Sequence, residues 1–458
     1  MHSQEKQILI DSLSDKGRGV SSNHSFEVPG ALPEEEVLIE LGPRRRKKRI
    51  GYLREVVTPS SSRVKPRCSH VPDCGGCAFQ QLDYSAQLLL KQKRVEGLFD
   101  FPVDPIIGCD DPWHYRNKME FSFSQNKAGD YFLGLMLAGG KGRVGNVSNC
   151  SLASSWFSKT LQAVRAWWES SDLQAYHHRS DQGHLRTLTL REAKQGEGKM
   201  AMLTVSGNPD FALKREEMNQ FIEAVKGATP EGSLSVFIQI QQIAKGRPTQ
   251  FFEMLVDGPD HITERLSIAL NGEIHTLDFK ISPTSFFQPN TLQAQKLYSA
   301  GLGMLTLEGA RVFDLYCGGA TLGLAAAKVA KEVVGIERNP HSVFDAGWNQ
   351  EVNEIDNFSI ERGDVGEKLK EWEADPDFVP PDVVIVDPPR MGLDQTALTC
   401  LKKWGAPEIL YISCNPKTQA ENVLELIEAG YVLKKIQPVD QFPHTYHIEN
   451  ICLLTKSQ

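Results

Sequence analysis

The C-terminal part of the sequence alternates short apolar runs with segments of helical periodicity. Four mostly apolar runs are typical of buried strands, at residues 312–316, 333–336, 383–386 and 408–412. Apolar positions at helical spacing occur at 322–330 and 420–429, and a last apolar run occupies 451–455. Strands that alternate with helices predict a mostly parallel, doubly wound sheet. We therefore expect an α/β domain over residues 281–458.

Residues 1–58 have a different pattern. Strand-like runs separated by Asp-Lys-Gly, Pro-Gly and Gly-Pro turns lie at 7–10, 25–28, 36–40 and 50–56. This spacing predicts a small antiparallel β-barrel. Residues 59–280 mix short strands with helical stretches at 82–98, 155–169 and 214–226. We therefore expect a central α+β domain between the barrel and the α/β domain.

The composition indicates the cellular compartment in which we expect the protein. The net charge is −8, and no apolar run approaches the ~18 residues of a membrane span. The N-terminus lacks the charged and apolar regions of a signal peptide. We expect a cytoplasmic monomer with no membrane partner. Disulfides are rare in that compartment, so the nine cysteines indicate metal binding or catalysis.

One segment is strongly basic, although the chain as a whole is acidic. Arg44–Arg49 is an unbroken run of six cations between two expected strands. A charge run is often only a solvated loop, but a run held between two strands has a fixed position that suits phosphate groups. Because the whole chain is acidic, the run predicts a specific RNA or DNA partner rather than general polyanion binding.

The cysteine best placed for catalysis is Cys414, which directly follows the expected strand at 408–412. In open α/β sheets, ligands bind at the carboxyl ends of the strands. Two other polar motifs lie at such ends, in 387–390 and 317–321. A free cysteine is usually a small core residue, but the flanking Ser413, Asn415 and Pro416 favour a nucleophile in a transferase site.

The motif at 314–321 predicts a nucleoside cofactor. A strand enters a glycine-containing turn and then a helix, and Glu337 ends the next strand, where a carboxylate can accept both ribose hydroxyls. The same residues fit a relaxed dinucleotide fingerprint, so an NAD-dependent oxidoreductase is an alternative. Asp314 lies where a dinucleotide site usually has an apolar residue, and no hydride-transfer pair follows. Both observations favour S-adenosylmethionine.

Three further cysteines, Cys68, Cys74 and Cys77, have the spacing of metal ligands, on a loop tightened by Gly75 and Gly76. A tetrahedral site needs a fourth ligand. We expect Cys150 in that place, with Cys109 as the alternative. The spacing alone fits zinc and an iron–sulfur cluster about equally.

Together these motifs resemble those of the RNA uracil-5 methyltransferases, which are class I enzymes that use S-adenosylmethionine. The matching segments are 285–290, 314–318, 335–337, 387–390, 413–416 and 442–449. The N-terminal segment is similar to the TRAM barrel, and the resemblance includes the cysteine loop and Tyr115–Lys118. Residues 155–280 match weakly, and Ala320 stands where the family usually has a second glycine. The pattern is most similar to the bacterial 23S rRNA enzymes.

The resemblance implies a Rossmann-like catalytic domain and a role for each motif residue. Cys414 would be the nucleophile and Glu449 the base. Residues expected to contact S-adenosylmethionine are Gln288, Tyr316, Thr321, Glu337, Asp364 and Asp387. Residues expected to hold a [4Fe–4S] cluster are Cys68, Cys74, Cys77 and Cys150.

The resemblance also implies an RNA substrate, and 23S rRNA is the preferred one. Bacterial tRNA enzymes of this type generally lack both the barrel and the four-cysteine loop, although tRNA stays an alternative. Cytosine-5 methylation is disfavoured because the Pro-Cys and Thr-Cys pairs of those enzymes do not surround Cys414. An RNA-binding module with an inactive catalytic domain is disfavoured because Cys414 and Glu449 are both present.

Overall fold

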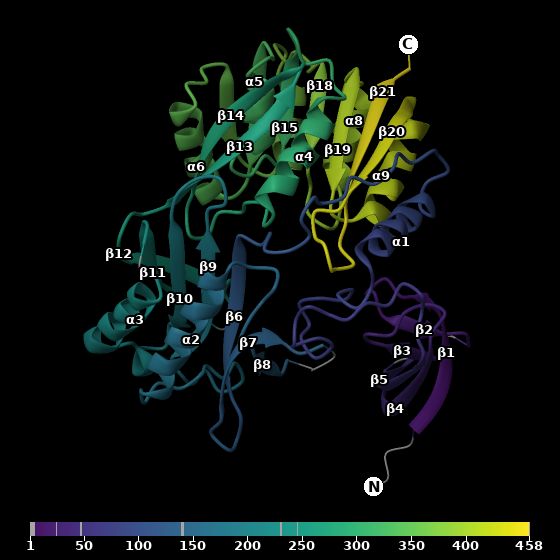
Figure 1. Ribbon diagram of the computed structural model, residues 1–458. Helices are drawn as coiled ribbons and strands as arrows, with labels where there is room; N and C mark the ends of the chain where they lie inside the picture. Colours follow the sequence, from purple (N-terminus) through teal and green to yellow (C-terminus); the bar gives the residue numbers. More distant parts are fainter. Residues whose placement is uncertain are drawn as a thin grey trace.

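The computed structural model describes residues 5–23, 25–45, 48–138, 142–229, 231–244 and 246–457. Figure 1 shows three units, which are an N-terminal barrel, a central sheet with two helices on one face, and a C-terminal α/β domain. This agrees with the predicted fold class. Within the described residues, no helix is long and apolar enough to cross a membrane. The expected monomer and cytoplasmic location stay predictions.

The predicted N-terminal barrel is present. It closes in the order β1-β2-β3-β5-β4, and its strands are β1 (Glu5–Leu13), β2 (Gly19–Ser21), β3 (Phe26–Val28), β4 (Glu36–Arg45) and β5 (Lys48–Thr58). Ile10, Val28 and Ile39 form its core. Of the predicted basic run, Arg46 and Lys47 lie outside the described residues. The Arg49 Nε atom donates a hydrogen bond to the Gly42 carbonyl at 2.7 Å.

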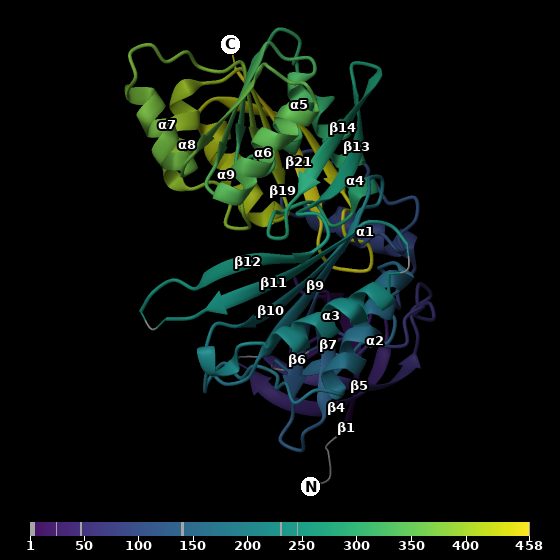
Figure 2. The same cartoon turned by 90° about the vertical axis from the view of Figure 1, so that its left-hand side faces the viewer.

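The central unit is a seven-stranded sheet in the order β12-β11-β10-β9-β6-β7-β8. Its strands are β6 (Lys118–Gln125), β7 (Tyr131–Met136), β8 (Val144–Asn146), β9 (Leu185–Glu192), β10 (Lys199–Ser206), β11 (Leu234–Gln242) and β12 (Gln250–Asp257). Helices α2 (Ser155–Glu169) and α3 (Arg215–Gly227) lie on one face, where Trp168 and Phe221 fill the core. The other face is turned toward the C-terminal domain (Figure 2).

The C-terminal unit is a seven-stranded sheet in the order β17-β16-β15-β18-β19-β21-β20. Its strands are β15 (Arg311–Leu315), β16 (Glu332–Glu337), β17 (Phe358–Arg362), β18 (Val383–Val386), β19 (Glu408–Ser413), β20 (Tyr431–Val439) and β21 (Glu449–Lys456). Its helices are α4 (Thr291–Leu302), α5 (Thr321–Ala327), α6 (Pro340–Val352), α7 (Val365–Ala374), α8 (Gln395–Trp404) and α9 (Pro416–Glu428). Among the described strands of this sheet, β21 alone runs in the opposite direction to the others.

A hairpin before residue 281 packs with the C-terminal domain. It consists of β13 (Ile262–Leu270) and β14 (Glu273–Ile281). Leu266 and Phe279 of the hairpin are buried in the same core as Val312 and Leu324. The hairpin therefore belongs to this core, although its residues precede 281, where we expect the domain to begin.

Helix α1 (Tyr84–Glu96) lies between the barrel and the C-terminal domain (Figure 1). The Lys91 ammonium is 2% exposed and pairs with the Asp440 carboxylate, which is 0% exposed. Lys91 also donates to the Phe442 carbonyl at 3.0 Å, and the Tyr84 hydroxyl donates to Asp440 at 2.9 Å. These bonds fix the segment that leads into Glu449.

Removing the buried cation should destabilise the protein. In Lys91→Met, Asp440 keeps a buried carboxylate without its ion-pair partner, a change that costs about 3–5 kcal/mol. We expect a lower midpoint in chemical denaturation, measured by circular dichroism. Lys93→Met, on an exposed position of the same helix, is the control and should leave the midpoint nearly unchanged. Equal midpoints for the two variants would contradict the role of the ion pair.

Candidate active site

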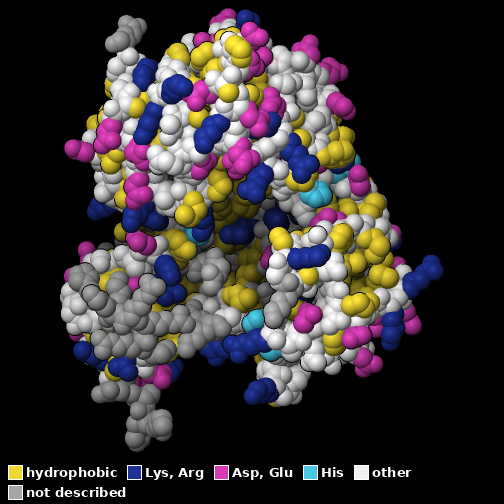
Figure 3. Space-filling view, turned by 180° about the vertical axis from the view of Figure 1, so that it is seen from behind, with side chains coloured by type: hydrophobic (Ala, Val, Ile, Leu, Met, Phe, Trp, Pro, Cys, Tyr) yellow, Lys and Arg dark blue, Asp and Glu magenta, His cyan; other side chains and the backbone are white. Residues whose placement is uncertain are grey.

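The predicted catalytic residues meet at one edge of the C-terminal sheet. The parallel strands β15, β16, β18 and β19 end at this edge, and the antiparallel strand β21 begins there. Ser413 pairs with Asn450 across β19 and β21. Cys414 follows Ser413 and Glu449 precedes Asn450, so the two residues are neighbours across the strands. Figure 3 shows that the molecule is hollowed between this domain and the two N-terminal units.

The turn after β15 is built around two carboxylates. Asp314 accepts a hydrogen bond from the Gly323 N–H at 2.8 Å. The two oxygens of Glu337 accept from the Gly318 N–H at 3.0 Å and from the Asn339 N–H at 2.6 Å. Both carboxylates therefore hold the turn against the strand ends, and Glu337 lies where the sequence predicts it.

Ala320 occupies a backbone conformation that favours glycine. It has φ 63° and ψ 30°, and it caps α5 with its side chain buried. An L-residue in this region costs roughly 1–2 kcal/mol. The turn therefore closes with the alanine in place, at the cost of local backbone strain.

The other predicted cofactor residues also lie at this edge. Tyr316 donates its hydroxyl to Asp394 at 3.0 Å, and Thr321 is the first residue of α5. Asp364 caps α7 by accepting the Glu367 N–H. Gln288 is buried, and its side-chain oxygen accepts from the Gln441 amide at 3.4 Å.

Three buried acids with little compensating charge surround the site. Burial raises the pKa of Asp314 to about 8 and that of Asp387 to about 7. Burial and the nearby Asp387 raise the pKa of Glu449 well above its usual range. Tyr298 on α4 is also buried, and these three acids add to the effect of burial in raising its pKa. Sequence reasoning missed Tyr298 because its helical spacing is that of an ordinary core residue.

Because these acids are buried with little compensating charge, a positively charged group bound at this edge would be stabilised. A buried carboxyl with a raised pKa becomes easier to ionise when a cation binds nearby. The sulfonium group of S-adenosylmethionine is such a cation, and Glu337 presents carboxylate oxygens to ribose hydroxyls. The donor set of the site therefore fits this cofactor.

Cys414 is partly buried and has only one cation close to it among the described residues. Burial, and then Glu449 and Asp387, raise the pKa of its thiol to about 11, while Arg390 opposes the rise. The Arg390 guanidinium also hydrogen-bonds His447 at 3.2 Å. Burial and the positive charge of Arg390 lower the pKa of His447 to about 4, so His447 is neutral and accepts this bond. Arg390 is thus the group that favours the thiolate.

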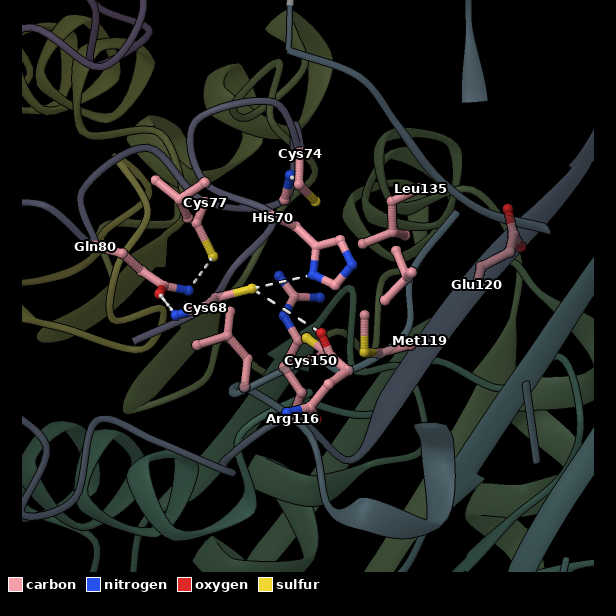
Figure 4. Close-up of a pocket in the computed structure, with 15 residues that line it drawn as sticks. Cys68, His70, Cys74, Cys77, Gln80, Arg116, Met119, Glu120, Leu135 and Cys150 are labelled. Carbon is pink, nitrogen blue, oxygen red and sulfur yellow. Dashed lines mark hydrogen bonds between the residues drawn. The ribbon is translucent and has the colours of Figure 1, made fainter. Parts of the chain in front are cut away.

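The four predicted metal-ligand cysteines lie around a single cavity of about 280 Å³ (Figure 4). These are Cys68, Cys74, Cys77 and Cys150. Two N–H groups point at sulfur, since Gln80 donates to Cys77 at 3.2 Å and the Gly76 N–H donates to Cys74 at 3.4 Å. Cys109 lies elsewhere, against Asn290 and the Asp440 carbonyl.

The arrangement of these thiols differs from that of a single-ion site. Among the described residues, no three His, Cys, Asp or Glu side chains are placed to hold one metal ion. The sulfurs instead line the walls of a cavity, and N–H donors face two of them. This donor set fits a cysteine-ligated cluster, whose sulfurs commonly accept hydrogen bonds.

Comparisons with known proteins agree with this geometry. The sequence model of a family described as tRNA (Uracil-5-)-methyltransferase matches residues 233–457. An uncharacterized RNA methyltransferase of Protochlamydia amoebophila is 47% identical, over 94% of this chain and 100% of that protein. The chain belongs to the RNA uracil-5 methyltransferase family.

Two further relatives of this methyltransferase span almost the whole chain. An uncharacterized RNA methyltransferase of Clostridium acetobutylicum is 34% identical, over 99% of this chain and 98% of that protein. The crystal structure of the Pyrococcus abyssi tRNA (uracil-54, C5)-methyltransferase in complex with S-adenosyl-L-homocysteine is 25% identical, with a TM-score of 0.75. That alignment covers 98% of this chain and 100% of the other.

The electrostatics of Cys414 predict its reactivity. Because its thiol pKa is about 11, little thiolate is present at neutral pH, and alkylation by iodoacetamide should still accelerate above pH 9. Asp387→Asn removes a negative neighbour and should shift the profile to lower pH, whereas Arg390→Gln should shift it upward. The alkylated Cys414 peptide is quantified by mass spectrometry. A plateau near the pKa of an ordinary thiol would contradict the assignment.

Proposed function

We propose that this protein transfers a methyl group from S-adenosylmethionine to C5 of a uridine in 23S rRNA, with Cys414 as nucleophile and Glu449 as base. The observation that carries the proposal is the β19–β21 register, in which Ser413 pairs with Asn450. This register puts a thiol and a carboxyl side by side at the edge where class I methyltransferases bind their ligands.

The chemistry needs both groups. C5 of uracil is too weak a nucleophile to take a methyl group directly, so the Cys414 thiolate adds to C6 and makes C5 nucleophilic. The cofactor supplies the methyl group as an electrophile on a positively charged sulfur. Glu449 then removes the proton from C5, and the Cys414–C6 bond breaks to release the product. A positioned base of this kind contributes ~10²–10⁴-fold.

The remaining predicted residues suit the cofactor. Each oxygen of Glu337 accepts one backbone hydrogen bond and keeps a lone pair for a ribose hydroxyl. Thr321 opens α5, where the helix N-terminus offers free N–H groups. We propose that Gln288, Tyr316 and Asp364 line the same site, and that the buried Asp387 faces the positive sulfur.

A covalent adduct tests this mechanism. RNA that contains 5-fluorouridine should remain bound to the wild type through denaturing electrophoresis, because fluorine at C5 cannot be removed as a proton. Cys414→Ala should form no adduct and lose methyl transfer, because it lacks the nucleophile. Glu449→Gln should methylate ordinary RNA once and accumulate the adduct.

Retained methylation in Cys414→Ala would exclude the covalent route. Failure of Glu449→Gln to form any adduct would place the action of Glu449 before methyl transfer. Cofactor binding, measured by calorimetry, is the control and should persist in Cys414→Ala.

We also propose that the four-cysteine cavity holds a [4Fe–4S] cluster. Support comes from the number of thiols, from the N–H groups that face two of them, and from the family resemblance. Arg116 also lines this cavity and would offset part of the negative charge of four thiolates. The cluster would connect the loop at 68–77 to residue 150 and so brace the barrel against the central sheet.

Iron content tests the cluster. Protein purified without oxygen should be brown and hold about four irons per chain. Cys150→Ser should lose iron, while Cys109→Ser is the matched control and should retain it. One zinc per colourless chain would refute the cluster, and iron retained in Cys150→Ser but lost in Cys109→Ser would move the fourth ligand to Cys109.

The proposed 23S rRNA substrate rests on the accessory parts. The barrel extends the molecule well beyond the catalytic edge (Figure 1), and the four cysteines line a cavity outside that edge. A site inside a large folded RNA requires such a wide contact surface, and the family resemblance links both parts to 23S rRNA enzymes.

A tRNA substrate is the second candidate. The Pyrococcus abyssi enzyme that acts on uracil-54 of tRNA aligns with 98% of this chain. That alignment includes the region of the barrel, so a barrel is compatible with a tRNA enzyme.

A direct comparison of substrates decides between the two. The enzyme is incubated with labelled S-adenosylmethionine and either protein-free 23S rRNA or an unmodified tRNA transcript. We expect label in the rRNA, with an affinity that falls steeply as salt is raised, because phosphate contacts release counterions. Label that enters only the tRNA would refute the rRNA assignment and support the second candidate.

A further inference from the structure

Strands β11 and β12 form a hairpin that extends from the edge of the central sheet (Figure 2). It projects beneath the C-terminal domain, on the side away from the barrel. Large apolar side chains remain exposed along it, with Phe251 at 48% and Phe252 at 51%. Ile240, Ile243, Met254 and Leu255 are exposed in the same way. Exposed apolar residues gathered in one element mark an interaction surface.

The polar residues of the hairpin indicate what it binds. Residues 232–252 contain no Asp or Glu, although the chain as a whole has a net charge of −8. Four glutamines lie in this stretch, at 239, 241, 242 and 250, and Arg247 adds a positive charge. The acid that follows this stretch, Glu253, accepts a hydrogen bond from the Gln239 amide at 2.8 Å. Aromatic rings combined with amides and cations are the composition of surfaces that stack nucleic-acid bases.

The strand register separates the two faces of the hairpin. Phe251 lies opposite Gln241, and Leu255 lies opposite Phe237. Since side chains that pair directly share a face, these four residues lie on one face, whereas Phe252 lies on the other. The pair Gln239 and Glu253 lies between the two pairs, on the face of Phe251, where the two side chains hydrogen-bond each other. Phe237 belongs to a buried cluster against which Phe287 packs, and Phe287 is the residue next to Gln288 of the proposed cofactor site. The face of Phe251 is therefore continuous with the catalytic edge.

We propose that this face, formed by Gln241, Phe251 and Leu255 and called here the hairpin platform, stacks unpaired nucleotides that flank the target uridine. The inference rests on the proposed RNA substrate and adds where the rest of that substrate lies. A base must be unstacked before Cys414 can reach its C6 atom, so its neighbours lose their stacking partners. The Phe251 ring replaces such a partner, and the Gln241 amide can hydrogen-bond a base edge.

Two aromatic residues of similar exposure provide a matched pair of variants. Phe251→Ala should weaken binding of the RNA substrate about 5- to 150-fold, the range of one base–aromatic stack. Phe252→Ala removes the same ring from the opposite face and should leave the affinity unchanged. Binding is measured by filter retention with protein-free 23S rRNA and with an unmodified tRNA transcript. Cofactor affinity and kcat at saturating RNA should not change in either variant.

A photo-cross-linking residue at position 251 tests contact directly. A benzoylphenylalanine there should label RNA at nucleotides beside the modified uridine, and the same residue at 252 should not. Equal losses of affinity in the two alanine variants, or unchanged affinity in Phe251→Ala, would overturn the platform. Cross-linking of position 251 to a second copy of the chain would overturn it too, and would identify β12 as a dimer edge.

These readouts separate the platform from the proposed reaction. If the wild type methylates no uridine in either RNA, the proposed function fails, but a cross-link from position 251 to RNA would still support the platform. If methylation occurs and position 251 labels no RNA, the platform alone is wrong.

Discussion

Strand β21 runs antiparallel between β19 and β20 and starts at the edge where the parallel strands end. Because of this reversal, the first residue of β21, Glu449, lies beside Cys414, which follows β19. The pairing is held by a buried amide pair, because Asn450 donates to the Gln419 oxygen at 2.8 Å and Gln419 donates to the Asn450 carbonyl at 3.1 Å. A slip of one residue would break both bonds and turn Glu449 away from Cys414.

The segment before β21 depends on a second buried contact. Lys91 and Asp440 are 349 positions apart in the sequence, yet their ion pair fixes the chain shortly before Glu449. Burial and the ion pair act oppositely on the pKa of Lys91, and burial is the larger effect and lowers it. A buried ion pair of this kind fixes the positions of the two segments that it joins and adds little net stability over an apolar contact. Helix α1 thus belongs functionally to the catalytic domain, although it follows the barrel in the chain.

The parts of the fold that sequence patterns predicted are those with local signals. Strands β15, β16, β18 and β19 are buried on both faces, so each is a mostly apolar run. Strand β17 was missed because Phe358–Arg362 lies at the edge of the sheet and is mostly polar. The β13–β14 hairpin could not be assigned to the C-terminal core, because alternation shows that a strand has one buried face without showing what covers that face.

In the candidate site, too, some features have a local sequence signal and others do not. Cys414, Glu337 and Asp387 follow apolar strands directly, so the rule that chemistry gathers at strand ends located them. The charges that act on Cys414 are not local in the sequence, since Glu449 and Arg390 come close to its thiol only in the folded chain.

The negative charge near Cys414 explains why Arg390, the one cation among the described residues that acts on it, matters. Two buried acids, Glu449 and Asp387, oppose the thiolate, and a positively charged cofactor would relieve that opposition when it binds. Addition of the thiol to uracil would then be favoured only when the methyl donor is present. In the proposed mechanism the thiol of Cys414 would therefore become more reactive once the methyl donor is bound, because the acids of the site have too little positive charge around them.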